Sequence, residues 1–284
     1  MIVITGASGQ LGRLVINKLL ESVSPTDLVA AVRSPEKVKD LAERGVEVRQ
    51  ADYNRPGTLD KAFAGADKLL LISSSEVGRR APQHANVITA AKKANVGLIA
   101  YTSILHADST PLSLGGEHRQ TEAFLAESGL PYVLLRNGWY TENYMAGIPA
   151  ALKTGVLLGS AGEGRISSAA RADYAEAAAA VLLSENPTGM VYELAGDEAY
   201  TLSEFADIVS KQSGKSVRYQ NMTESEYAGA LKSAGLPADL AKMLADSDAG
   251  ACKGGLFDDS KTLSHLIGRP TTRLSQMVRE TVAP

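Results

Sequence analysis

The first twelve residues constrain the fold of this chain more than any other segment. Ile2, Val3 and Ile4 form an apolar, β-branched run, which is typical of a strand buried on both faces of a parallel sheet. Three glycines follow at the spacing G-x-x-G-x-x-G, and a helix-patterned segment begins among them. A strand, a glycine-rich turn and a helix in this order bind phosphates, because glycines admit close approach of backbone N–H groups and the helix N-terminus supplies positive potential.

This turn is the first predicted part of a dinucleotide-binding site. Its predicted cofactor-binding residues are Gly6, Ala7, Ser8, Gly9, Gln10, Leu11 and Gly12. The alternative is a glycine-rich connection that binds nothing, but the position of the turn between a strand and a helix favours the nucleotide.

Strand and helix patterns then alternate regularly up to residue 136. Further strands are predicted at residues 28–32, 46–50, 68–72, 98–102 and 132–136. Helical segments separate these strands, and repeated strand–helix–strand units build a parallel sheet with helices on both faces. The predicted fold is therefore α/β, with a Rossmann-type doubly wound parallel sheet.

The residue at the end of the second strand distinguishes between dinucleotides. An NAD site usually carries an acidic residue about 20 positions beyond the glycines, where it accepts hydrogen bonds from the ribose. Arg33 stands in this region instead, with no carboxylate expected beside it, and its guanidinium suits a 2′-phosphate. We predict NADPH rather than NADH; the alternative for Arg33 is a solvated surface side chain.

Two more loops are predicted to line the nucleotide site. Asp52 and Tyr53 follow the third strand, where an adenine is flanked in such sheets, although Asp52 fits a helix cap equally well. The loop after the fourth strand is expected near the nicotinamide half of the cofactor, or else forms a polar turn. Its residues are Ile72, Ser73, Ser74 and Ser75.

The pattern becomes less regular after residue 136. We predict an NADP-binding domain over residues 1–153 and a smaller C-terminal lobe over residues 154–284 that mainly holds substrate. A strand near residues 190–194 is expected to return to the Rossmann sheet.

Composition disfavours several other classes of protein. The formal net charge is −3 and the pI is near 5.9, so no broad attraction for nucleic acid or anionic membranes is expected. No apolar run approaches the roughly 20 residues of a membrane helix. Cys252 is the single cysteine and the four histidines lack metal-ligand spacing, so we predict no disulfide, no metal and a cytoplasmic location.

Several segments together resemble one family. They are residues 6–12, Arg33, and residues 50–53, 69–77 and 135–144. On these segments the chain resembles the NmrA-like atypical short-chain dehydrogenase/reductases, and within them the bacterial NAD(P)H:quinone oxidoreductase and triphenylmethane reductase group. The resemblance runs nearly end to end. It implies an NADPH-dependent oxidoreductase that reduces quinones or similar small, planar, electron-poor acceptors.

The Tyr-x-x-x-Lys pair of ordinary short-chain dehydrogenases is absent. No tyrosine of the chain is followed by lysine four positions later. His118 and Glu122 lie near where other family branches keep the lysine, and their spacing predicts an exposed helical pair. A quinone does not require the catalytic pair, because the hydroquinone anion delocalises its charge and water supplies the proton. Direct hydride transfer without flavin then depends mainly on positioning.

The segment after the sixth strand supplies the remaining predicted site residues, which are Asn137, Gly138, Trp139, Tyr140 and Asn143. It leaves the carboxyl edge of the sheet, so it is expected to flank the nicotinamide ribose and ring. Trp139 or Tyr140 is a candidate aromatic wall, and Tyr140 or Asn143 a candidate catalytic donor to an oxyanion. The alternative for Trp139 and for Tyr144 is an ordinary core role.

Two alternative functions stay open. NmrA-like folds also bind dinucleotides without turnover, so a redox-sensing regulator is one alternative, and a triphenylmethane dye reductase is the other. A homodimer is compatible with this fold class, but periodicity does not identify an interface.

Overall fold

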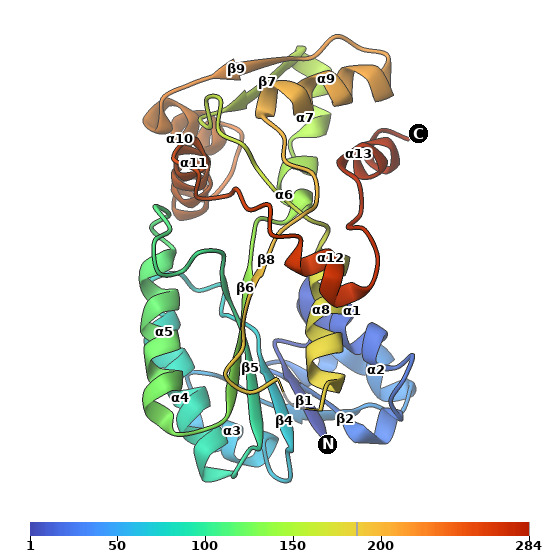
Figure 1. Ribbon diagram of the computed structural model, residues 1–284, viewed down its shortest axis with the longest axis vertical. Coiled ribbons are helices and arrows are strands. Elements are labelled where there is room, and N and C mark those ends of the chain that lie inside the picture. Colours follow the sequence, from blue (N-terminus) through green and yellow to red (C-terminus); the bar gives the residue numbers. More distant parts are fainter. Residues whose placement is uncertain (186, 284) are drawn as a thin grey trace. The chain divides into compact units, whose positions relative to one another are not determined.

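The computed structural model describes residues 1–185 and 187–283, and the chain divides into two compact units. The first unit comprises Met1–Ala107, Gly116–Asn137 and Arg171–Tyr192. The second comprises Asp108–Gly115, Gly138–Ala170 and Glu193–Pro284. Figure 1 labels the helices and strands of both.

A seven-stranded sheet forms the centre of the first unit. Its strands are β1 (Ile2–Thr5), β2 (Leu28–Val32), β3 (Glu47–Gln50), β4 (Lys68–Leu71), β5 (Leu98–Ile104), β6 (Tyr132–Asn137) and β8 (Val191–Leu194). The spatial order is β3-β2-β1-β4-β5-β6-β8, and all pairings from β3 to β6 are parallel. The order reverses between β1 and β4, where doubly wound sheets bind ligands. The predicted α/β fold is confirmed.

Helices cover both faces of this sheet (Figure 1). Helices α3 (Pro56–Ala62), α4 (Arg80–Lys93) and α5 (Gly115–Ser128) lie on one face, where apolar side chains of all three pack on the strands. Helices α1 (Gln10–Leu19) and α8 (Arg171–Leu183) pack together on the other face. Burial on both faces explains why β1 and β2 read as continuous apolar runs rather than as alternating patterns.

Short segments complete the edge of the first unit. They are the 3-10 helices η1 (Pro25–Asp27) and η2 (Pro35–Val38) and the helix α2 (Lys39–Glu43). Strand β3 at this edge is partly exposed along its whole length, in contrast to the fully buried β2 beside it.

The second unit contains a two-stranded parallel sheet of β7 (Val156–Gly159) and β9 (Arg218–Asn221). Its helices are α6 (Thr141–Met145), α7 (Ile148–Thr154), α9 (Leu202–Ser213), α10 (Glu224–Ser233), α11 (Ala238–Cys252), α12 (Thr262–Ile267) and α13 (Leu274–Val282). Helix α10 packs on α11, and α9 packs on β9 and α13. Capping boxes begin α9 and α10, each with a threonine N-cap and a glutamate three residues later.

A buried ion pair joins α5 to β6. Arg136 donates to both carboxylate oxygens of Glu122, from Nε at 3.0 Å and from Nη2 at 2.6 Å, and both side chains are at least nine-tenths buried. His118 is also buried, and its Nδ1 lies 2.7 Å from the Tyr101 hydroxyl. The predicted exposed pair of His118 and Glu122 is therefore wrong, because this face of α5 packs on the sheet.

Two buried histidines link α4 and α5 to neighbouring groups. His84 Nε2 accepts a hydrogen bond from the Ser74 backbone N–H at 2.9 Å, which leaves Nδ1–H to donate to Thr121 at 2.9 Å. His118 Nε2 lies 3.3 Å from Arg80 Nη1, a group that only donates. Burial, and secondarily the charge of Arg80, lowers the pKa of both histidines to about 3.

We expect these histidines to make the fold acid-sensitive. With a pKa near 6.5 unfolded and about 3 folded, each binds a proton only on unfolding between those values. The free energy of unfolding therefore falls as pH drops below about 6.5, by up to ~1.4 kcal/mol per pH unit for each histidine. Burial raises the pKa of Asp248 to about 6, so this group stabilises the fold as pH falls below that value. One such group opposes two histidines, so the free energy of unfolding still falls with decreasing pH.

Urea unfolding from pH 7.5 to 4.5 measures this slope. His84→Gln keeps a hydrogen-bond acceptor and donor but does not titrate, so its unfolding free energy should depend less steeply on pH than that of the wild type. Equal slopes in the two proteins would contradict a neutral, buried His84.

Candidate nucleotide-binding site

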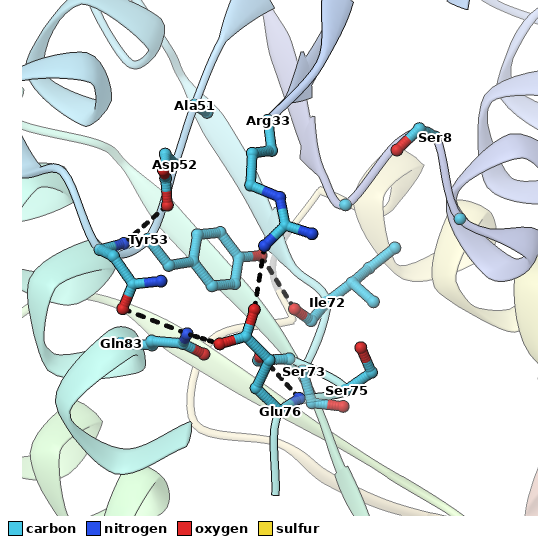
Figure 2. A pocket seen from close by; sticks show the side chains of 14 residues that line it. Ser8, Arg33, Ala51, Asp52, Tyr53, Ile72, Ser73, Ser75, Glu76 and Gln83 are labelled. Carbon is cyan, nitrogen blue, oxygen red and sulfur yellow. Dashed lines mark hydrogen bonds and ion pairs between the residues drawn. The ribbon is translucent and has the colours of Figure 1, made fainter. Parts of the chain in front are cut away.

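One cavity of the first unit lies at the carboxyl ends of β1 to β4, on both sides of the reversal in strand order. Its volume is about 290 Å³, and Figure 2 shows its lining side chains. Predicted residues from all four loops line it together: Gly6, Ser8, Gly9, Arg33, Asp52, Tyr53, Ile72, Ser73, Ser74 and Ser75. Four unpredicted residues complete the lining, namely Ala51, Asn54, Glu76 and Gln83.

The glycine-rich turn forms a narrow backbone cradle at one end of the cavity. Gly6 has a φ of +60°, and its carbonyl accepts a hydrogen bond from the Gly9 N–H at 2.9 Å. A Cβ on Gly12 would lie 2.6 Å from the Gly6 oxygen and 2.7 Å from Ala7 Cα. Helix α1 has no acidic residue in its first turn, so its N-terminus keeps its positive potential. This geometry fits a diphosphate.

Three other predicted residues of the turn lie outside the cavity lining. Ala7 and Leu11 are buried, while Gln10 is the exposed first residue of α1. None of the three lines the cavity.

A methyl group at Gly12 is expected to force α1 away from the turn. Gly12→Ala should lower the free energy of unfolding by about 1–3 kcal/mol through overpacking, and should weaken NADPH binding. The matched control is Gly57→Ala, since a Cβ there meets no atom within 4 Å. Thermal unfolding and NADPH titration of both variants test this; a Gly12→Ala variant that binds NADPH as tightly as Gly57→Ala would contradict the proposed cradle.

Tyr53 ties three strands together beneath the cavity. Its hydroxyl donates to the Ile72 carbonyl at 2.9 Å (Figure 2). It also contacts Thr5 Oγ1 at 2.5 Å, and burial raises its pKa. Thr5 Oγ1 in turn accepts a hydrogen bond from the Ile72 N–H at 3.1 Å. Tyr53 therefore fixes the loops after β3 and β4 at the rim of the cavity.

The carboxylate of Asp52 accepts a hydrogen bond from the Asn54 N–H at 2.9 Å and so closes a local turn. Helix α3 begins later, with Arg55 as its N-cap and no side-chain cap. The alternative that Asp52 caps this helix is therefore wrong.

The three serines after β4 form a hydrogen-bonded loop that also lines the cavity. The Ser73 N–H donates to Thr102 Oγ1 and the Ser74 N–H to His84, both at 2.9 Å. Ser74 Oγ accepts from the Glu76 N–H at 3.1 Å. The three serines therefore form a polar turn and also line the cavity.

Arg33 has a carboxylate beside it. Its Nη1 donates to Glu76 Oε1 at 2.9 Å (Figure 2), so the expectation of no neighbouring carboxylate is wrong. The two residues are 43 positions apart, and only the adjacency of the loops after β2 and β4 brings them together.

Gln83 is the unpredicted lining residue with the clearest capacity for a ligand. Its side chain is buried, and Nε2 donates to Glu76 Oε2 at 2.9 Å and to Asn54 Oδ1 at 3.3 Å. Its Oε1 has no hydrogen-bond partner among the described residues. A buried acceptor without a partner in a polar cavity fits the exocyclic amine of an adenine. No spacing signal identifies Gln83, whereas Asn54 and Glu76 adjoin predicted residues.

The remaining predicted residues do not line this cavity. Asn137 ends β6 in the first unit, and Gly138 begins the next stretch of the second unit. Trp139 is buried, Tyr140 is the N-cap of α6, and Asn143 lines a different cavity within the second unit.

This second cavity measures about 390 Å³ and is mostly apolar. Side chains of α7, β7, α9 and α10 line it, together with Asn143 and Tyr144 from α6. The Tyr144 hydroxyl donates to Asp248 Oδ1 at 3.0 Å, and its ring contacts Phe205 with centroids 5.9 Å apart. Tyr144 thus combines the predicted core role with a place in the cavity wall.

The described residues contain neither a metal-binding cluster nor a helix that could span a membrane. No group of three or more histidine, cysteine, aspartate or glutamate side chains within residues 1–185 and 187–283 is arranged to hold a metal ion. No helix in that same part of the chain is long and apolar enough to cross a membrane.

A glycine cradle at the switch point of a doubly wound sheet defines a dinucleotide-binding protein. A family model described as NAD(P)H-binding matches residues 6–185. The chain is also 30% identical to an NmrA-like family domain-containing oxidoreductase of Aspergillus flavus, over 80% of this chain and 76% of that protein. The chain therefore belongs to the NAD(P)H-binding, NmrA-like family.

Two relatives are more similar still. The chain is 61% identical to quinone oxidoreductase 2 of Escherichia coli, over 98% of this chain and 97% of that protein. The crystal structure of the E. coli NADPH-dependent quinone oxidoreductase complexed with NADPH matches with a TM-score of 0.97, over 99% of both chains. The Citrobacter triphenylmethane reductase complexed with NADP(H) matches with a TM-score of 0.96 at 39% identity, over 99% of this chain and 100% of that one.

Proposed function

We propose that this chain is an NADPH-dependent reductase that transfers hydride directly to quinones or similar planar, electron-poor acceptors. The observation that carries the proposal is the 61% identity, over nearly the whole chain, to an E. coli quinone oxidoreductase whose structure contains NADPH. When bound, NADPH supplies a hydride from C4 of its nicotinamide ring.

The cavity of the first unit supports a role for its residues in binding the adenine half of the cofactor. Backbone N–H groups of the turn at residues 6–12 would hold the diphosphate, and Arg33 the 2′-phosphate. Gln83 Oε1 would accept from the adenine amine. The loop at residues 72–75 lines the same cavity and would hold the neighbouring ribose.

The acceptor is assigned to the second unit, where the apolar cavity that includes Asn143 suits a planar, weakly polar molecule. Asn143 and Tyr140 are the proposed donors to the oxygen on which negative charge develops. Without a Tyr-x-x-x-Lys pair, the residues contribute mainly positioning and exclusion of water, and solvent completes protonation. No flavin is required by this scheme.

The cofactor assignment predicts the behaviour of Arg33→Ala. With 1,4-benzoquinone as acceptor, the KM for NADPH should rise about tenfold or more, because a charge-assisted hydrogen bond to the phosphate is lost. The KM for NADH should change little, and Arg44→Ala, which removes an exposed arginine bonded to Asn17, is the matched control. Absorbance at 340 nm follows the reaction.

Two outcomes of the same assay would change the proposal. Tight NADPH binding without oxidation by any benzoquinone or naphthoquinone would favour a redox-sensing regulator. Faster reduction of a triphenylmethane dye than of quinones would favour a dye reductase, which the 39% identity to the Citrobacter enzyme supports.

The acceptor assignment predicts the behaviour of Asn143→Ala. Loss of a donor to the developing oxyanion should lower kcat by about tenfold or more, with the Kd for NADPH unchanged. Asn17→Ala on the exposed face of α1 is the control. An unchanged kcat would remove Asn143 from the proposed mechanism, and Tyr140→Phe then tests the second candidate.

The pI near 5.9 and the single cysteine support a cytoplasmic location, with no nucleic acid or membrane as a partner.

A further inference from the structure

In the nucleotide cavity, the carboxylate of Glu76 forms an ion pair with Arg33, the residue proposed to bind the 2′-phosphate. Glu76 Oε1 accepts from Arg33 Nη1 at 2.9 Å, and Glu76 Oε2 accepts from the buried Gln83 at 2.9 Å (Figure 2). The Glu76 N–H also donates to Ser74 Oγ at 3.1 Å. Groups from the loop after β2, from α4 and from its own loop therefore hold Glu76 at the cavity wall.

The two side chains of this interaction differ in exposure and in the number of groups that hold them. The Arg33 side chain is 67% exposed, whereas that of Glu76 is 33% exposed and is anchored by Gln83. Arg79 Nη1 also lies 3.8 Å from Glu76 Oε2 and is a second cation for the carboxylate. Arg33 is thus the partner that turns away when an anion competes for it, while Glu76 stays in place.

A 2′-phosphate and a 2′-hydroxyl respond to this arrangement in opposite ways. A phosphate carries between one and two negative charges near neutral pH, so it must draw Arg33 from Glu76 and then lie close to a fixed carboxylate. A ribose hydroxyl instead donates to a carboxylate, as in NAD-selective sites. The Arg33–Glu76 pair therefore weakens the binding of NADPH and strengthens the binding of NADH.

We infer that Glu76 is a specificity-determining residue that limits the preference of this site for NADPH and lets it accept NADH as well. The inference rests on the proposed role of Arg33 in binding the 2′-phosphate. Glu76 acts through direct contact with the 2′ position of the cofactor, and Gln83 acts as a positioning residue that keeps the carboxylate there.

Equilibrium binding of NADPH and NADH, measured by cofactor fluorescence at constant ionic strength, tests the inference. Glu76→Gln should raise the ratio of NADH Kd to NADPH Kd by about fivefold, which corresponds to the loss of one like-charge contact. Tighter NADPH and weaker NADH binding should both contribute. Glu76→Ala should move the ratio in the same direction, which shows that the lost charge and not the new amide is responsible.

The control is Glu47→Gln, which removes an exposed carboxylate paired with Arg49 outside the cavity and should leave the ratio unchanged. The Arg33→Ala variant tests separately whether Arg33 binds the 2′-phosphate, on which the role of Glu76 depends. A lower ratio in Arg33→Ala with an unaltered ratio in both Glu76 variants overturns the role of Glu76 alone. An unaltered ratio in Arg33→Ala overturns the assignment of Arg33.

Discussion

The close approach of α1 to the turn that follows β1 is the constraint on which the nucleotide site depends. A Cβ at Gly12 would lie 2.6 Å from the Gly6 oxygen, so this approach exists only because position 12 has no side chain. The contact aims the N-terminus of α1 at the cavity, and the left-handed backbone of Gly6 turns the chain into that helix. The other three loops line the same cavity, and this contact shapes the end of it that the glycine-rich turn forms.

Neutral polar groups hold much of the framework of those loops, and the Arg80 guanidinium adds a hydrogen bond to the Ser74 carbonyl. Tyr53 bonds to Thr5 and to the Ile72 carbonyl, and His84 accepts from the Ser74 N–H, all in places where burial favours uncharged forms. In contrast, the pair of Arg33 and Glu76 lies at an accessible rim. Exposed pairs contribute only about 0–1 kcal/mol, so this pair exchanges partners at little cost while the framework behind it stays fixed.

The sequence was least informative about the second unit. Strands β7 and β9 are four residues long, and β9 is largely exposed, so neither shows a clear alternating pattern. Gly159 of β7 lies against Leu202 of α9, where an added Cβ would lie 2.7 Å from Leu202 Cδ1. The apolar cavity beside them depends on α7 and α10, which are far apart in the sequence. Such a cavity has no local signature because its walls come from unrelated segments.

Elements whose causes are local could be predicted from the amino-acid sequence. Buried strands of a parallel sheet, the glycine turn and the cation at the end of β2 are recognisable because strand burial, backbone freedom and strand-end position are set within a few residues. Which side chains meet across loops depends on the three-dimensional fold. Glu76 reaches Arg33 over 43 positions, Gln83 enters the cavity, and Glu122 pairs with Arg136 inside the fold. These contacts depend on strand order and helix orientation, which short-range patterns do not encode.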